Sequence, residues 1–198
     1  MNANTALPLA QTPSSLSSAR TILHNYQDLI VLFNDTFTET ENTVLLRGDQ
    51  EPIYIPAKNL QPYHQIVFAH GYFASALHEI AHWCIAGKQR RLLEDYGYWY
   101  SPDGRDVKQQ AEFEKMEVKP QAIEWAFSCV SGKPFAVSTD NLNGAVVDTQ
   151  GFQDAVKYQV LFYLKHGFPP RAAEFMGVLQ EFYQTENMNE EMFDAGSA

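Results

Sequence analysis

An H-E-x-x-H pattern occupies residues 78–82, inside an apolar stretch that begins at Tyr72. Positions four residues apart share one face of an α-helix, so the imidazoles of His78 and His82 can hold one metal ion. Two unpaired histidines and a carboxylate on one buried helix face would be costly without a cation. The pattern therefore predicts a metal-binding helix that ends near Gly87, where cationic residues follow.

A third protein ligand is expected from another segment, because two histidines rarely complete a metal site. Within residues 111–129, polar side chains recur at spacings of three and four: Glu114, Glu117, Gln121, Glu124 and Ser128. Since Pro120 fits the first turn of a helix, we expect this helix to start close to it. Glu117 would project from its beginning, and we predict Glu117 as the third ligand, with Glu124 as the alternative and Glu114 as the third choice.

The spacing of these residues is compatible with two kinds of enzyme. In zincin-type peptidases, H-E-x-x-H and a later glutamate bind zinc, and the motif glutamate, here Glu79, is the general base for water. In non-haem iron oxygenases, two histidines and one carboxylate occupy one face of the metal and leave other positions open. A metal-stabilised binding protein without catalysis is a third interpretation, and the donor set accepts iron, zinc or manganese.

Further segments match one family in the order in which they occur along the chain. They are residues 48–54, 66–71, 78–87, 96–106, 117–122 and 140–142. In these segments the sequence resembles the bacterial elongation factor P hydroxylase family, over roughly residues 20–185. The resemblance implies an enzyme that uses O2 to hydroxylate a lysine of translation elongation factor P after that lysine has received a β-lysyl group. It also implies an Fe(II) site on His78, His82 and a downstream glutamate.

The resemblance changes the expected catalytic role of Glu79. An oxygenase does not require this carboxylate to deprotonate water, so we expect Glu79 to orient the bound oxygen species or to receive the cationic amine of the substrate. No sequence pattern indicates a pocket for 2-oxoglutarate. The sequence therefore does not identify which co-substrate supplies the electrons for the reaction with O2. A zincin-type metallopeptidase is the alternative function.

A substrate pocket is predicted from an aromatic segment. Tyr98 and Tyr100 alternate onto one side of the extended residues 96–100, and a turn sequence that contains Asp103 follows. We hypothesise that the aromatic faces line the pocket and that Asp103 or Asp106 supplies the counter-charge for an ammonium group. The alternative is that the tyrosines fill the core of a sheet, because aromatic residues favour strands.

Composition favours one well-filled domain, since the chain has 198 residues of which 45% are hydrophobic. The net charge of -10 suits a cationic target and argues against nonspecific nucleic-acid binding, which needs clustered Lys and Arg. The sequence has no apolar stretch of membrane-spanning length, and its first residues lack the basic start of a secretion signal. We therefore expect no membrane partner and a cytoplasmic location.

We expect an α+β fold with a single domain, in which a zincin-like metal-binding helix packs on a small mixed sheet and further helices follow. Its boundaries are a disordered leader at 1–17, a metal-dependent hydroxylase domain at 18–184 and an acidic, frayed tail at 185–198. Besides the motif helix, the patterns predict helices at 18–37, 117–130, 152–165 and 171–183, a hairpin of strands 43–47 and 53–55, and further strands at 65–69 and 135–137.

Overall fold

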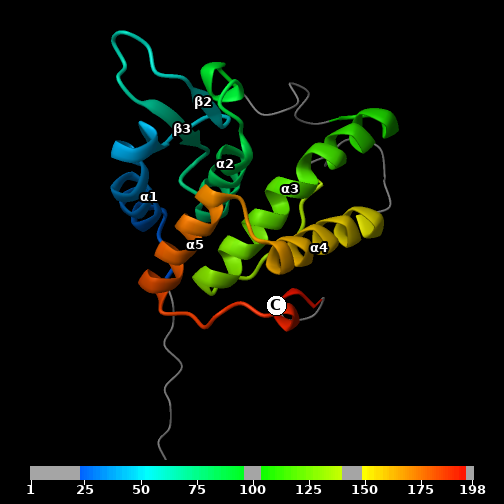
Figure 1. Ribbon diagram of the computed structural model, residues 1–198. Helices are drawn as coiled ribbons and strands as arrows, with labels where there is room; N and C mark the ends of the chain where they lie inside the picture. The colour runs from blue at the N-terminus through cyan, green and yellow to red at the C-terminus, as the bar shows by residue number, and fades with distance from the viewer. Residues whose placement is uncertain (1–22, 96–103, 140–148, 195–198) are drawn as a thin grey trace, which may run out of the picture.

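The computed structural model describes residues 23–95, 104–139 and 149–194. In these residues the fold is α+β, as predicted (Figure 1). The helices are α1 (Tyr26–Glu41), α2 (Phe73–Ile85), α3 (Val107–Ser131), α4 (Thr149–His166) and α5 (Pro170–Tyr183), with short 3-10 helices η1 (Arg90–Leu92) and η2 (Glu190–Phe193). The strands are β1 (Thr43–Arg47), β2 (Ile53–Ile55) and β3 (His64–Phe68).

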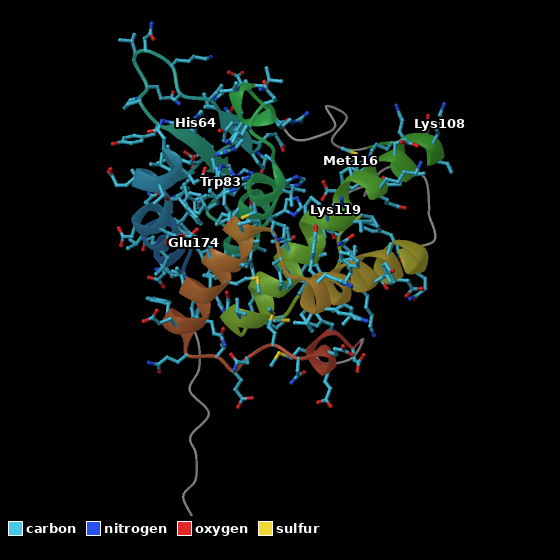
Figure 2. The ribbon with its side chains drawn as sticks, in the orientation of Figure 1. His64, Trp83, Lys108, Met116, Lys119 and Glu174 are labelled. Carbon is cyan, nitrogen blue, oxygen red and sulfur yellow. The ribbon has the colours of Figure 1, made fainter. Side chains whose placement is uncertain are left out.

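The elements are arranged around α2 and α3. The sheet and α1 lie at one end of the molecule, α4 lies at the other, and α2, α3 and α5 lie between them (Figure 1). The start of α3 projects beyond the other helices, and its exposed side chains include Lys108, Met116 and Lys119 (Figure 2). Among the described residues, none of the helices has the length and apolar content of a membrane span.

The sheet has the strand order β1-β3-β2, with β1 parallel and β2 antiparallel to β3. The strands are close to their predicted positions, but the predicted hairpin of β1 and β2 is wrong, because β3 lies between them. Asn34 of α1 hydrogen-bonds to the backbone N–H and C=O of Leu45 and so closes the outer edge of β1. The other edge of β1 pairs with β3. Ile66 and Phe68 of β3 are buried.

The first helix begins later than the sequence predicted. Asn25 is its N-cap and accepts a hydrogen bond from the backbone N–H of Gln27, so residues 23–25 are not helical. The left-handed Asn42 ends the helix after Glu41. Its predicted apolar face is buried, at Leu29, Phe33 and Phe37.

The long helix α3 shows that the start predicted near Pro120 is wrong. Asp106 and Gln109 form a capping box: the Gln109 N–H donates to the Asp106 carboxylate (2.9 Å) and the Asp106 N–H donates to the Gln109 side chain (3.0 Å). Pro120 removes one hydrogen bond from the interior of the helix. Packing of α3 against α2, α4 and α5 outweighs this loss, so Glu117 and Glu124 lie on one continuous helix.

The last two long helices agree with their predicted ranges to within three residues. The strand predicted at 135–137 is wrong, because residues 133–139 run without a strand partner. The structure describes residues 185–194 of the predicted tail. Phe193 of η2 is fully buried and packs edge-on against Trp125 of α3, with 5.3 Å between ring centroids. The predicted leader at 1–17 lies outside the described residues.

Phe193 provides a test of whether the tail belongs to the folded core. We expect Phe193→Ala to lower the free energy of unfolding by about 3 kcal/mol, because truncation of a fully buried phenylalanine leaves a cavity. Denaturant unfolding would measure the change. The neighbouring Glu191 is exposed, so Glu191→Ala should change the stability by less than about 0.5 kcal/mol. Equal stability of the two variants would show that the tail frays.

Candidate metal centre

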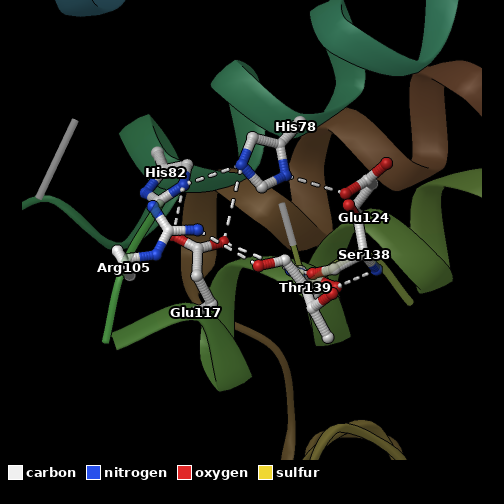
Figure 3. A network of polar contacts seen from close by, with 8 residues as sticks. His78, His82, Arg105, Glu117, Glu124, Ser138 and Thr139 are labelled. Atoms are coloured by element: carbon white, nitrogen blue, oxygen red, sulfur yellow. Dashed lines mark hydrogen bonds and ion pairs between the residues drawn. The ribbon is translucent and has the colours of Figure 1, made fainter. Parts of the chain in front are cut away.

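Two helices bring three potential metal ligands together (Figure 3). His78 and His82 lie on successive turns of α2, and Glu117 lies on α3. His82 Nε2 is 3.0 Å from His78 Nε2 and 3.2 Å from Glu117 Oε1, and His78 Nε2 is 3.5 Å from Glu117 Oε2. One ligand atom from each residue lies within 4.8 Å of the others. The group can therefore hold a metal ion, and its ligand role stays a prediction.

The charges around this group also suit a cation. Burial lowers the pKa of His78, but the carboxylates around it, led by Glu124, outweigh burial and raise that pKa to about 10. Burial raises the pKa of Glu117, but His82 and His78 outweigh it and lower the value to about 2. Each histidine therefore faces negative charge that a divalent ion would balance. Two imidazoles and a carboxylate match the ligand preferences of iron, zinc and manganese.

The exposure of the three side chains distinguishes an accessible site from a closed structural one. Glu117 is only 5% exposed, whereas His78 is 28% exposed. His82 is 16% exposed. The carboxylate thus comes from the interior and the imidazoles border the surface. An ion held by these three residues would lie between the interior and the surface, which suits an accessible site better than a closed structural one.

Glu124, the alternative ligand, contacts the ring nitrogen of His78 that faces away from His82 and Glu117. Its Oε2 is 2.8 Å from His78 Nδ1, while His78 Nε2 faces His82 and Glu117. A carboxylate that accepts the Nδ1 proton fixes the imidazole tautomer that leaves Nε2 for a metal. This geometry favours an orienting role for Glu124. Glu114, the third choice, lies outside the group and accepts a hydrogen bond from Gln110.

Gln121 of α3 lies next to Glu117. The Nε2 of the buried Gln121 is 3.5 Å from Glu117 Oε2. The same amide donates to the carbonyl of Ser138 (2.7 Å) and accepts from its backbone N–H (3.0 Å). Gln121 thus fixes residues 138–139 beside the metal-ligand group. Its place in the polar stripe of α3 was visible in the sequence.

Arg105 was missed by the sequence analysis. It is 1% exposed, stacks on Phe113 with 3.8 Å from Cζ to the ring centroid, and lies beside Glu117 and His82 (Figure 3). Its Nε donates to the side chain of Gln110 (2.9 Å) and its Nη2 donates to the carbonyl of Thr139 (3.1 Å). Arg105 precedes α3 in a segment without hydrophobic periodicity, so no sequence pattern identified it.

Glu79 is separate from the three-residue group and lines a neighbouring cavity of ≈ 40 Å³. The other lining residues are Tyr54, Ile66, His82, Trp83, Ala86, Arg90, Arg91 and Asp95. Burial raises the pKa of the Glu79 carboxyl, while the nearby imidazoles of His78 and His82 oppose that rise. Glu79 is therefore a partly desolvated acid in a cavity that His82 also borders.

The predicted substrate pocket is only partly within the described residues. Tyr98, Tyr100 and Asp103 lie outside them. Asp106 is exposed, and its carboxylate caps the start of α3. The structure thus gives Asp106 a helix-capping role, and its contact with a substrate stays a prediction.

The geometry ranks the two glutamates by their effect on metal binding. Glu117→Gln should remove nearly all metal affinity, because it replaces the only carboxylate in the three-residue group. Glu124→Gln should weaken binding by about 10- to 100-fold, the usual effect of losing a partner that orients a ligand. Metal titration of the apoproteins would measure both constants. Weaker binding by Glu124→Gln than by Glu117→Gln would exchange the two roles.

Two comparisons with known proteins identify the family of this chain. The family model for elongation factor P hydroxylase matches residues 32–193, a range that includes both helices of the metal-ligand group. A Haemophilus influenzae protein named elongation factor P lysine hydroxylase is 52% identical over 164 residues, which are 83% of this chain and 92% of that protein. The resemblance predicted from the sequence motifs is confirmed, and the chain belongs to the elongation factor P hydroxylase family of enzymes.

Proposed function

We propose that this chain is a non-haem iron-dependent hydroxylase that uses O2 to modify the β-lysylated lysine of elongation factor P. The observation that carries the proposal is the convergence of His78, His82 and Glu117, because two histidines and one carboxylate are the ligand set of non-haem iron oxygenases. Membership of the family supports the choice of elongation factor P as the protein substrate. A cytoplasmic location is part of the proposal, because an enzyme that acts on a translation factor would share the compartment of that factor.

The residues present fit an iron ion. When bound by His78, His82 and Glu117, Fe(II) would supply the activation of O2 that hydroxylation of an unactivated C–H bond requires. Glu124 holds His78 with Nε2 directed at the other two ligands. Zinc or manganese would fit the same donors, so metal supply and geometry decide between them.

Glu79 is proposed to bind an ammonium group of the lysylated substrate. Among the described residues, no hydrogen bond or ion pair satisfies its carboxylate, and a desolvated carboxylate is costly without a cationic partner. Tyr54 and Trp83 line the same cavity, and aromatic faces attract ammonium groups. A β-lysylated lysine carries two ammonium groups, so one of them can bind here while the aliphatic chain extends toward the metal.

A zincin-type metallopeptidase is the alternative, favoured by the H-E-x-x-H pattern together with Glu117. In that mechanism Glu79 would remove a proton from the attacking water. The two functions therefore differ in what they require of Glu79 and of O2.

The metal assignment is tested by His82→Ala. We expect this variant to lose stoichiometric metal and hydroxylation while it stays folded, because the core remains intact without the ligand. Metal analysis after anaerobic purification, circular dichroism, and the intact mass of co-expressed elongation factor P would test the three expectations. A full equivalent of metal in His82→Ala would show that the site is wrong.

Glu79→Gln separates the hydroxylase from the peptidase. For a hydroxylase we expect bound iron and measurable hydroxylation, with KM for the lysylated factor raised about tenfold by loss of the ion pair to the substrate. Single-turnover reactions over a range of substrate concentrations, followed by intact mass, would measure this. Metal-dependent peptide cleavage by the wild type that consumes no O2 and vanishes in Glu79→Gln would establish the peptidase instead.

A further inference from the structure

A residue of α5 hydrogen-bonds to the C-terminal end of α2. His82 lies in the last turn of α2, where the Ala86 N–H donates to the carbonyls of His82 (3.1 Å) and Trp83 (3.2 Å). The next carbonyl, that of Cys84, has no partner further along the helix among the described residues. Arg171, near the start of α5, donates from Nη2 to the carbonyl of Cys84 (3.1 Å) and to that of Ala86 (2.7 Å). Its guanidinium also stacks on the ring of Trp83, 4.3 Å from Cζ to the centroid. Arg171 therefore contacts three of the four residues that follow His82.

Trp83 of α2 and Glu41 of α1 contact this arginine. Trp83, which is buried, packs edge-on against Phe33 (5.1 Å) and Phe37 (4.9 Å) and lies between α1 and α5 (Figure 2). Glu41, the last residue of α1, is 3.8 Å from Arg171 Nη1. The side chain of Arg171 is thus held by an aromatic face and two carbonyls, while the Glu41 carboxylate lies near the buried Nη1 without a hydrogen bond to it.

We propose that Arg171 is a positioning residue for the metal centre. By fixing the last turn of α2, it holds the backbone of His82 so that His82 Nε2 stays beside His78 and Glu117. The proposal rests on the metal role proposed above for His82. It assigns a function in the metal centre to a residue that lies 89 positions further along the chain and touches none of the three ligands.

The chemistry of arginine supports a positioning role over simple stabilisation. A guanidinium is planar and offers several N–H groups in fixed directions, whereas a lysine ammonium is a flexible point charge. A positive charge at the end of α2 is also favourable for the helix dipole. However, burial of a charged pair often contributes no more to stability than apolar packing would. The geometry therefore points to the direction of the hydrogen bonds, and not the charge alone, as the reason for arginine at this position.

Two substitutions separate these contributions. Arg171→Lys keeps the charge but loses the fixed planar direction of the two N–H groups on Nη2. Arg171→Met keeps packing on Trp83 but has no donor for the two carbonyls. We expect both variants to bind Co(II) about tenfold more weakly than the wild type, within the range for residues that orient metal ligands. We also expect the visible absorption spectrum of the Co(II) protein to change, because the spectrum reports the geometry around the ion. Thermal unfolding would record any loss of stability separately.

Arg91→Lys is the matched control. Arg91 also pairs with Glu41, with 2.7 Å between Nη1 and Oε2, but donates no side-chain hydrogen bond to α2 among the described contacts. Its substitution should leave the Co(II) affinity and spectrum at wild-type values. If Arg171→Met fails to fold, Arg171→Lys alone carries the comparison with Arg91→Lys.

The outcomes distinguish the proposal from the function on which it rests. Wild-type Co(II) affinity and spectrum in the folded Arg171 variants would overturn the positioning role, even if their melting temperatures fall. The same result in Arg91→Lys as in Arg171→Lys would also overturn it, because any loss of an arginine next to Glu41 would then suffice. If the wild type binds Co(II) no better than His82→Ala does, the proposed metal site itself is wrong.

Discussion

The contact between α2 and α3 places a buried carboxylate against two imidazoles, and the rest of the described structure depends on it. Glu117 is nearly inaccessible to water, and an ionised carboxylate is costly in such a place unless cationic or hydrogen-bonding groups surround it. His78, His82 and Gln121 supply those groups. The two helices are therefore held in one relative position, because sliding α3 by a turn would leave Glu117 buried without a partner.

The sequence correctly predicted that His78, His82 and Glu117 lie together, although it placed the start of the helix wrongly. Glu117, Gln121 and Glu124 share a face because of their spacing, and spacing is unaffected by where the helix begins. The error came from Pro120, which is typical of the first turn of a helix, whereas α3 begins at the capping box of Asp106 and Gln109. A capping box adds hydrogen bonds at the true start, while proline inside a well-packed helix removes only one.

Contacts between distant segments explain the other differences. Strand positions follow from alternating hydrophobicity, but the order of strands does not. No local pattern reveals that the side chain of Asn34 from α1 hydrogen-bonds to Leu45 at the outer edge of β1. Arg105 and Arg171 lie at the start of helices, where an arginine is unremarkable by itself. The partners of Arg171 at Cys84 and Ala86 precede it by more than eighty residues. Phe193 is a single aromatic residue in an acidic tail, so composition predicted fraying and its burial against Trp125 did not follow from the sequence.

The two histidines of the motif are supported by different means. His78 is oriented through its own ring, because Glu124 on α3 contacts Nδ1. Arg171 on α5 acts on the backbone that follows His82, and not on its ring. Both supports approach from elements other than the sheet, and Glu79 lines a cavity bordered by Tyr54 of β2 and Ile66 of β3. Contacts from α3 and α5 thus reach the two histidine turns of α2, whereas the sheet side of α2 borders the cavity in which we propose that Glu79 binds a substrate ammonium group.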